Sequence, residues 1–572
     1  MKIILSILLS AFFLFSIPIY AEEPTQESTA ELYIAFFDRA SDAKGLDYWL
    51  KSGLSLEQIS ENFFYQEETQ KKYPNSLTNE EFITTVYKNL FEHEPDEDGL
   101  EYWVRELDSG TITRSSAILD IIRGALGDDK IIVQNKTEVG LYFAESGLND
   151  SDQARAVMEG VTVDTQSVED AKAMIDEFAN QPITPESLVW TQQYGTVSYD
   201  YGKAVTTDND GYIYIVGATG GNLDDNTRYG GWDIFLTKFS KLGTRIWTKQ
   251  YGAAKNDIGY GITVDNKGDI YITGERGGDV FVSKIDSDGQ RIWNKVFGSI
   301  NSSDIGHSIA IDSAGYIYIT GVTYGNMKNI QNLGGGDIFL AKFTNDGTNL
   351  WIKQYGSTED DIANSVGIDS QDDIFISGST LGDLDGNTQG GYGDIFLSKF
   401  NSEGIRAWTT LFGSYASDVG SSMDIDRADN IYITGGTSGD MIDDEFVSES
   451  WNIFLTKLNT EGETDWTRQY GTSELDFACS VTAGENEKVY ITGVTSGDLA
   501  NDNPNGKGDI FLSEFDSSGV RLSTEQYGSK EADIGYSLTT DRDGDIYITG
   551  ATEGDLDGNS SGDGDIFLSK FE

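Results

Sequence analysis

Short acidic motifs are the stretches of this chain whose residue types and spacing suit a metal ion. Their carboxylate and amide oxygens are the hard ligands that Ca²⁺ takes. The complete twelve-residue calcium loop with its closing Glu is absent, and the same short side chains also form Asx-turns with their own backbone. Two interpretations therefore stay open, bound Ca²⁺ or turn structure, and the sequence suggests no other cofactor. The candidate ligands are Asp383, Asp385 and Asn387, their near copies Asp555, Asp557 and Asn559, and the related pair Asp224 and Asn226.

A second set of aspartates recurs at one fixed place in seven similar segments. Seven carboxylates around one opening could collect a cation. A function located at one site rarely needs seven identical copies, so we expect each aspartate to cap backbone N–H groups beside a neighbouring repeat. These aspartates are Asp200, Asp257, Asp304, Asp361, Asp418, Asp476 and Asp533.

Other residue types used in catalysis are scarce. The chain has two histidines, His93 and His307, and one cysteine, Cys479. This leaves little room for a histidine metal site or histidine-dependent catalysis, and it excludes an intramolecular disulfide. We expect Cys479 to be a small buried apolar residue. Because no catalytic constellation is found, the sequence favours a protein that is not an enzyme.

The balance of charges excludes some partners. Asp and Glu number 95 against 40 Lys and Arg, so the 572 residues carry a formal net charge of −55. Such a surface repels nucleic-acid phosphates and anionic lipid headgroups, and it also keeps a protein soluble. We therefore expect no nucleic-acid partner, and no membrane contact beyond an export signal.

Residues 1–21 have the pattern of that signal. Lys2 precedes an apolar run from Ile3 to Ile17, and Pro18 and the small Ala21 follow. Cleavage after Ala21 predicts an exported protein that is extracellular, on the cell surface or periplasmic. An uncleaved membrane anchor is the alternative, because the run approaches the roughly 18 residues that can span a bilayer.

Two kinds of element follow the signal, and the first kind is helical. Residues 30–180 have helical periodicity, and one motif in them returns 54 residues later. The doubled motif resembles the DUF4214 family, an all-helical module of secreted and surface-attached bacterial proteins, and the resemblance implies an all-α domain without a settled activity. The two copies read Asp42-Ala-Lys-Gly-Leu-Asp-Tyr-Trp49 and Asp96-Glu-Asp-Gly-Leu-Glu-Tyr-Trp103.

The aromatic residues of this motif admit two interpretations. Trp49 and Trp103 lie three residues after Leu46 and Leu100, a spacing that favours a helical core. The Tyr-Trp pairs could instead form a platform that stacks on sugars. The aspartate that opens each copy is expected to be a helix N-cap.

Residues 188–572 repeat one pattern seven times. Each unit has four strand-like runs, such as the alternating Ile270-Tyr-Ile-Thr, and this period is typical of a propeller with four-stranded blades. The motifs resemble the SBBP repeat, a family named for seven-bladed β-propellers, and the resemblance implies an all-β seven-bladed β-propeller. The units are marked by Trp190, Trp247, Trp293, Trp351, Trp408 and Trp466, with Leu522 in the seventh place.

The order of the strands predicts how the ring closes. Residues 188–194 match an outermost strand, and residues 565–571 match a third strand. Every blade has four strands only if this N-terminal strand completes the last blade, which also removes the exposed edge of an open array. Residues 181–187 are then the linker between the two domains.

Loop lengths indicate which face binds a partner. Loops between second and third strands and loops between blades share one face of such a ring, and the former vary in length from residues 275–278 to residues 379–393. Variable loops on a rigid scaffold are common binding sites. We therefore expect an exported or cell-surface recognition or adhesion-type monomer that binds an extracellular protein or glycan, with Ca²⁺ as a candidate cofactor. The alternative is a propeller-based hydrolase or lyase that acts on extracellular polysaccharide.

Overall fold

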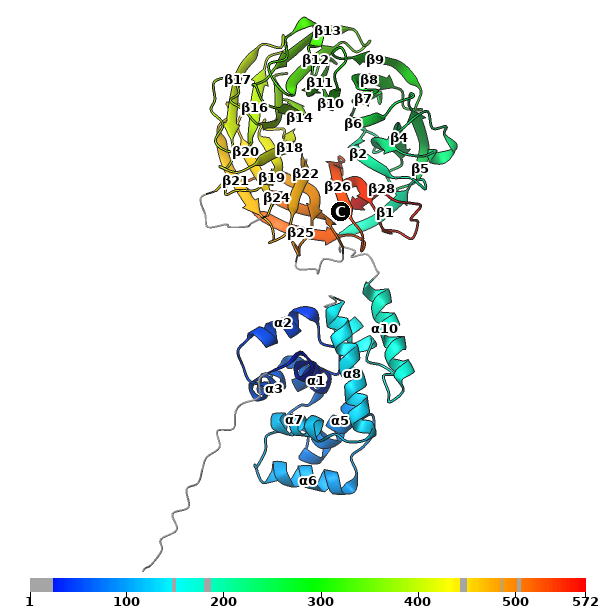
Figure 1. Ribbon diagram of the computed structural model, residues 1–572, viewed down its shortest axis with the longest axis vertical. Helices are drawn as coiled ribbons and strands as arrows, with labels where there is room; N and C mark the ends of the chain where they lie inside the picture. The colour runs from blue at the N-terminus through cyan, green and yellow to red at the C-terminus, as the bar shows by residue number, and fades with distance from the viewer. Residues whose placement is uncertain (1–23, 147–150, 180–186, 443–449, 485–486, 501–505) are drawn as a thin grey trace, which may run out of the picture. The chain divides into compact units, whose positions relative to one another are not determined.

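The computed structural model describes residues 24–146, 151–179, 187–442, 450–484, 487–500 and 506–572 (Figure 1). The chain divides into two compact units, Met1–Asn180 and Gln181–Glu572. The predicted signal, residues 1–21, and most of the predicted linker, residues 181–187, lie outside the described residues. None of the helices in the described ranges is long and apolar enough to cross a membrane.

The first unit is helical, as predicted. Its core includes Phe36, Phe63, Phe82 and Phe143, which are fully buried. The helices are α1 (Gln26–Phe37), α2 (Ala43–Lys51), α3 (Leu56–Phe64), α4 (Glu67–Lys72), α5 (Asn79–Phe91), α6 (Glu97–Asp108), α7 (Arg114–Gly124), α8 (Asp128–Glu145), α9 (Ser151–Ala156) and α10 (Thr165–Ala179).

The doubled motif forms the N-terminal parts of α2 and α6. Asp42 and Asp96 are N-caps that accept hydrogen bonds from the backbone N–H three residues on, as predicted. Trp49 and Trp103 are partly buried against the helical core, which agrees with the core interpretation. The tyrosine beside each tryptophan is exposed, whereas Leu46 is buried and Leu100 packs against the core, so the motif contributes to both the interior and the surface.

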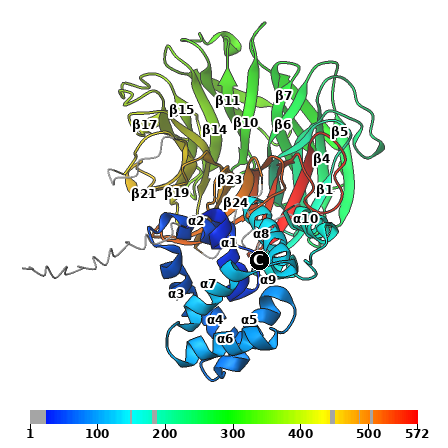
Figure 2. The ribbon, with the colours of Figure 1, turned by 60° about the horizontal axis from the view of Figure 1, so that its bottom comes forward.

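The second unit is a ring of seven antiparallel four-stranded sheets, and Figure 2 shows the ring from a second direction. From the innermost strand outward, the blades are: first, β2 (Asp200–Thr207), β3 (Ile213–Thr219), β4 (Asp233–Phe239) and β5 (Arg245–Tyr251); second, β6 (Asp257–Val264), β7 (Ile270–Arg276), β8 (Asp279–Ile285) and β9 (Arg291–Phe297); third, β10 (Asp304–Ile311), β11 (Ile317–Thr323), β12 (Asp337–Phe343) and β13 (Asn349–Tyr355); fourth, β14 (Asp361–Ile368), β15 (Ile374–Thr380), β16 (Asp394–Phe400) and β17 (Arg406–Phe412); fifth, β18 (Asp418–Ile425), β19 (Ile431–Thr437), β20 (Asn452–Leu458) and β21 (Thr464–Tyr470); sixth, β22 (Asp476–Ala483), β23 (Lys488–Thr495), β24 (Asp509–Asp516) and β25 (Arg521–Tyr527); seventh, β26 (Asp533–Thr540), β27 (Ile546–Thr552), β28 (Asp565–Phe571) and β1 (Leu188–Tyr194).

The N-terminal strand closes the ring. β1 pairs antiparallel with β28, from Leu188 opposite Phe571 to Tyr194 opposite Ile566, and the two strands lie side by side in Figure 1. The prediction that the first strand completes the last blade is therefore confirmed. Closure leaves β28 with a partner on both sides, as every other third strand has.

Burial follows the position of each strand in its blade. The second and third strands are buried almost throughout, because each blade packs face to face on its neighbours, whereas most residues of the fourth strands are partly or fully exposed. Short turns connect first to second strands, and four of the seven have the sequence Asp-x-x-Gly. In one of them the Asp265 carboxylate accepts from the N–H groups of Lys267 and Asp269, and Gly268 has a φ of 82°.

The loops between second and third strands and the loops between blades share one face, as predicted. For example, the N–H of Gly220 after β3 donates to the carbonyl of Tyr199 before β2, and the N–H of Asp257 donates to the carbonyl of Trp232 before β4. We call this side of the ring the loop face. The turns between first and second strands and between third and fourth strands form the opposite face.

Candidate binding site in the channel and on the loop face of the propeller

Each innermost strand contains a β-bulge at the same place. In β2, Gly202 pairs with Gly217 and Ala204 pairs with Val216, so Lys203 has no partner on β3. The other six innermost strands show the same register shift. A bulged residue is released from the ladder and is often turned toward a functional site.

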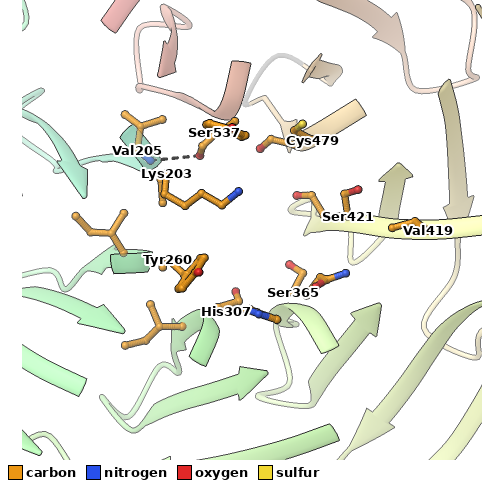
Figure 3. Close-up of a pocket in the computed structure, with 18 of the residues that line it drawn as sticks. Lys203, Val205, Tyr260, His307, Ser365, Val419, Ser421, Cys479 and Ser537 are labelled. Atoms are coloured by element: carbon orange, nitrogen blue, oxygen red, sulfur yellow. Dashed lines mark hydrogen bonds between the residues drawn. The ribbon is translucent and has the colours of Figure 1, made fainter. Parts of the chain in front are cut away.

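The seven bulged residues face the central channel, and we call them the bulge ring. They line a cavity of about 530 Å³ together with neighbouring residues of the innermost strands. In Figure 3 the side chain of Lys203 extends toward the middle of this cavity, with Tyr260, His307, Ser421 and Cys479 around it. The bulge ring is Lys203, Tyr260, His307, Asn364, Ser421, Cys479 and Tyr536.

Desolvation controls the protonation of the bulge ring. Burial lowers the pKa of His307 to about 4 and raises the pKa of the Cys479 thiol to about 11, so both groups are neutral near pH 7. Nδ1 of His307 lies 2.9 Å from the carbonyl oxygen of Ala363, which only accepts, so Nδ1 carries the proton and Nε2 is left as an acceptor. Burial also lowers the pKa of Lys203.

Serine side chains join the innermost strands behind the bulge ring. The hydroxyl of Ser537 on β26 accepts from the N–H of Val205 on β2 at 3.2 Å, which closes the seam between the last and first blades. Ser308, Ser422 and Ser480 accept equivalent bonds, and Ser365 donates to the carbonyl of Met423. These bonds hold neighbouring innermost strands at a fixed separation, and so they fix the channel. In the first two blades Ala204 and Gly261 occupy this position.

The seven repeated aspartates are structural. Each is buried, at most 1% exposed, at the start of an innermost strand. Asp533, for example, accepts from the N–H and the hydroxyl of Ser529 in the loop that precedes it. The expectation that these carboxylates cap backbone N–H groups is confirmed, and they do not contribute to the cavity lining among the residues that the structure describes.

The candidate calcium ligands lie in loops of three different blades. Asp224 and Asn226 belong to the first blade, the Asp383–Asn387 motif to the fourth, and the Asp555–Asn559 motif to the seventh. The motifs of the fourth and seventh blades are separated by two whole blades, so they do not form one site. No group of three or more His, Cys, Asp or Glu side chains that could hold a metal is found within the described ranges.

The side chains of each motif form hydrogen bonds or ion pairs within the protein that the sequence of the motif does not indicate. Asp385 pairs with Arg406 and accepts from the hydroxyl of Thr409. Asp224 pairs with Arg245 at 2.9 Å. The remaining side chains make turn contacts. Asp383 accepts from Gln389, Asp555 accepts from Gly558, Asp557 accepts from Gln193 and Asn559, and Asn226 and Asn387 each donate to nearby backbone carbonyls. This geometry fits the turn interpretation, and calcium binding stays a prediction.

Exposed tyrosines of the propeller gather on the loop face. Tyr229, Tyr324, Tyr392 and Tyr415 are the exposed tyrosines of its described residues, and each lies in a loop of this face. Tyr392 lies in the fourth blade, and Tyr415 lies in the loop that joins this blade to the fifth. They are 82% and 74% exposed, and the N–H of Tyr392 donates to the carbonyl of Ala416. The loop face therefore presents large amphipathic side chains.

An aromatic cluster connects the loop face with the channel. The ring of Tyr201 lies 5.5 Å from that of Trp232 and 6.2 Å from that of Tyr536 in the bulge ring. Tyr199, in the loop before β2, also contacts Trp232. The mouth of the channel is thus lined by aromatic rings on the side of the first and seventh blades.

Sequence reasoning missed the bulge ring. The prediction for Cys479 was wrong, because this residue lines the channel and is partly exposed. A signal was nevertheless present. The position three residues after each repeated aspartate holds a different residue in almost every unit, between a preceding Gly or Ala and a following small residue. Variation at one slot of an otherwise regular repeat indicates a position that the fold leaves free.

Comparisons with known proteins agree with this architecture. The family model "Domain of unknown function (DUF4214)" matches residues 60–125. The SBBP model, "Beta-propeller repeat", matches residues 189–224, 246–281, 292–326, 350–385, 407–441 and 524–557. The chain thus carries a DUF4214 segment followed by SBBP repeats, and both resemblances are confirmed.

Individual relatives are distant. "Regulatory protein FlaEY" of Caulobacter vibrioides and an uncharacterized WD repeat-containing protein of Acanthamoeba polyphaga mimivirus are each 25% identical over 172 residues, or 28% and 25% of this chain. The chain spans only 18% and 12% of their lengths. Similar solved structures include the Pan2 WD40 domain of Neurospora crassa (11% identity, 68% of this chain and 97% of that chain, TM-score 0.40) and a gluconolactonase of Xanthomonas campestris (11%, 68% and 95%, 0.32).

Proposed function

We propose that this chain, a DUF4214 segment joined to a seven-bladed propeller of SBBP repeats, is an exported, non-enzymatic recognition protein. The loop face binds an extracellular protein or glycan. The placement of the exposed tyrosines carries this proposal, because all of them in the described propeller lie on one face. Tyrosine supplies rigid contact area with a polar end at low entropic cost, and its ring face also stacks on sugars.

The lining of the channel favours binding over hydrolysis. Cleavage of a polysaccharide uses a pair of carboxyl groups or a metal-bound water. Among the described residues, none of those lining the cavity is Asp or Glu, and the nearby repeated aspartates are occupied with backbone N–H groups. The alternative of a propeller-based hydrolase or lyase on extracellular polysaccharide therefore has less support.

The test uses the full chain and two matched double variants. Tyr392→Ala with Tyr415→Ala removes exposed side chains from the loop face. Leu242→Ala with Ile405→Ala removes exposed side chains, 84% and 62% exposed, from the opposite face. Each protein is applied to a glycan array and to extracellular proteins of the native surface. Binding that the tyrosine variant loses and the control keeps supports the proposal and identifies the ligand class. Equal binding by both variants overturns it.

Export is tested separately. Expressed in a bacterial host, the protein should leave the cytoplasm and begin at Glu22, which the mass of the N-terminal peptide reports. A cytoplasmic protein that keeps Met1 would contradict export.

A further inference from the structure

The channel differs in charge from the rest of the molecule. The chain has 95 acidic residues, yet the described residues that line the cavity include one cation, Lys203, and no carboxylate. Chance placement would favour acidic groups there more than twofold, since Lys and Arg together number 40. The cavity is therefore an electrically distinct site in a strongly anionic protein.

Lys203 has no anionic partner in the described structure. Its Nζ lies 4.1 Å from the centre of the Tyr536 ring, a cation–π contact, and Cys479 and His307 lie around the same cavity in Figure 3. Both of these are neutral near pH 7. Desolvation lowers the pKa of Lys203. Lys203 is partly buried, and a partly desolvated cation without a counter-charge is costly, so an anion in the cavity would offset that cost.

Hydrogen-bonding groups around Lys203 are also free for a ligand. Tyr260, Ser421 and Tyr536 make no hydrogen bonds to other described residues through their side chains. By contrast, Asn364 already donates to the carbonyl of Gly420. Hydroxyl groups can donate to a carboxylate, and Nε2 of His307 can accept from a hydroxyl group. The cavity of about 530 Å³ lies in the range of small-molecule sites.

We propose that the channel binds a small organic acid whose carboxylate pairs with Lys203 inside the bulge ring. This site is separate from the macromolecular contact of the loop face. A carboxylate suits it better than a phosphate or sulfate, because one lysine matches one charge and the described residues that line the cavity include no arginine to bind a second. Hydroxyl groups and rings around the lysine suit a hydroxylated acid such as a sugar acid.

The experiment is calorimetric titration of the full chain with glucuronate as the probe. Glucose and glucuronamide are neutral matches of the same size. Lys203→Met should weaken glucuronate binding on the order of 10- to 100-fold, the usual loss for a charged hydrogen bond. The control is Lys255→Met. Lys255 is an exposed lysine of the loop face that donates to the carbonyl of Gly277, and it lies outside the cavity lining. Binding of glucuronate and glucuronamide with equal affinity would overturn the proposal.

A second measurement needs no variant. A lysine-acylating reagent is applied to the wild-type chain with and without glucuronate, and peptide mass spectrometry follows Lys203 and Lys255. Protection of Lys203 alone supports the proposal even if Lys203→Met fails to fold. If saturating glucuronate, lactate and benzoate leave Lys203 as reactive as without them and give no saturable heat, the channel is not an acid site.

Discussion

Replacing Gln250 with Leu should release the loop that carries Tyr229 on the loop face. Gln250 lies on β5 and is 7% exposed. Its Oε1 accepts from the N–H of Leu223 at 3.1 Å, and its Nε2 donates to the carbonyl of Gly221 at 3.0 Å and to Asp233 at 2.8 Å. One side chain thus fixes two points of the loop and the start of the next strand.

The magnitude follows from the three hydrogen bonds that a Leu side chain cannot make. Loss of the bonds to the N–H of Leu223 and to the carbonyl of Gly221 costs about 1 kcal/mol each, and loss of the charged bond to Asp233 costs about 2 kcal/mol, or about 4 kcal/mol in all. After the replacement, Oδ2 of Asp233 keeps the N–H of Tyr229 at 2.7 Å, and its Oδ1 has no partner among the described residues. Because the loop opens more easily than the blade, this loss should appear as local opening.

Native-state hydrogen exchange measures that opening. We expect the amide of Leu223 to exchange two to three orders of magnitude faster in Gln250→Leu, since each 1.4 kcal/mol is a factor of ten. Gln192→Leu is the control, because Gln192 is an exposed glutamine whose side chain donates only to the adjacent carbonyl of Thr191. Exchange at the wild-type rate in Gln250→Leu would refute the reasoning, and so would an equal acceleration in the control.

Three further predictions concern the channel and its support. Lys203→Met should raise the free energy of unfolding by about 1 kcal/mol at pH 7, because it removes a partly buried cation that has no counter-charge among the described residues. Since desolvation lowers the pKa of Lys203, the stability of the wild-type protein should rise toward pH 10, and the variant should lack that part of the rise. Denaturant unfolding at several pH values tests both expectations. Ser480→Ala leaves the N–H of Leu538 unpaired and should cost about 1–2 kcal/mol in the same assay, whereas Ser421→Ala should cost little, and equal losses would contradict the role of the seam. Burial raises the pKa of Asp533 to about 6, so its contribution to stability is largest below about pH 4 and is lost as pH rises through 6. Asp533→Asn should therefore remove about 1 kcal/mol of the stability difference between pH 5 and pH 7.5 in calorimetry, and an unchanged difference would contradict it.

The architecture could be predicted because it depends on spacing. The regular return of a tryptophan, and the match of residues 188–194 to a fourth strand, determine the number of blades and the closure that β1 and β28 show. The candidate sites depend instead on contacts between distant residues. Asp385 meets Arg406 from the fourth strand of its blade, and Asp224 meets Arg245 in the same way. No pattern within either acidic motif indicates these arginines.

The bulge ring was missed for a related reason. A bulge is a property of strand register, and register became visible only when β2 was paired with β3. Lys203, His307 and Cys479 occupy equivalent slots in their repeats, but they share no chemistry that a motif search would join. Their common feature is a place in the fold, not a residue type.

The bulges also bear on how proteins of this architecture could diversify. A bulged residue can be replaced without disturbing the strand pairing on either side of it. Mutations in the bulge ring could therefore change which molecules bind in the channel while the propeller keeps its stability. Gly202, just before one slot, has no such freedom, because a Cβ there would come within 2.4 Å of Thr549. Selection for binding a new small molecule and selection for stable innermost strands would thus act on adjacent but different residues.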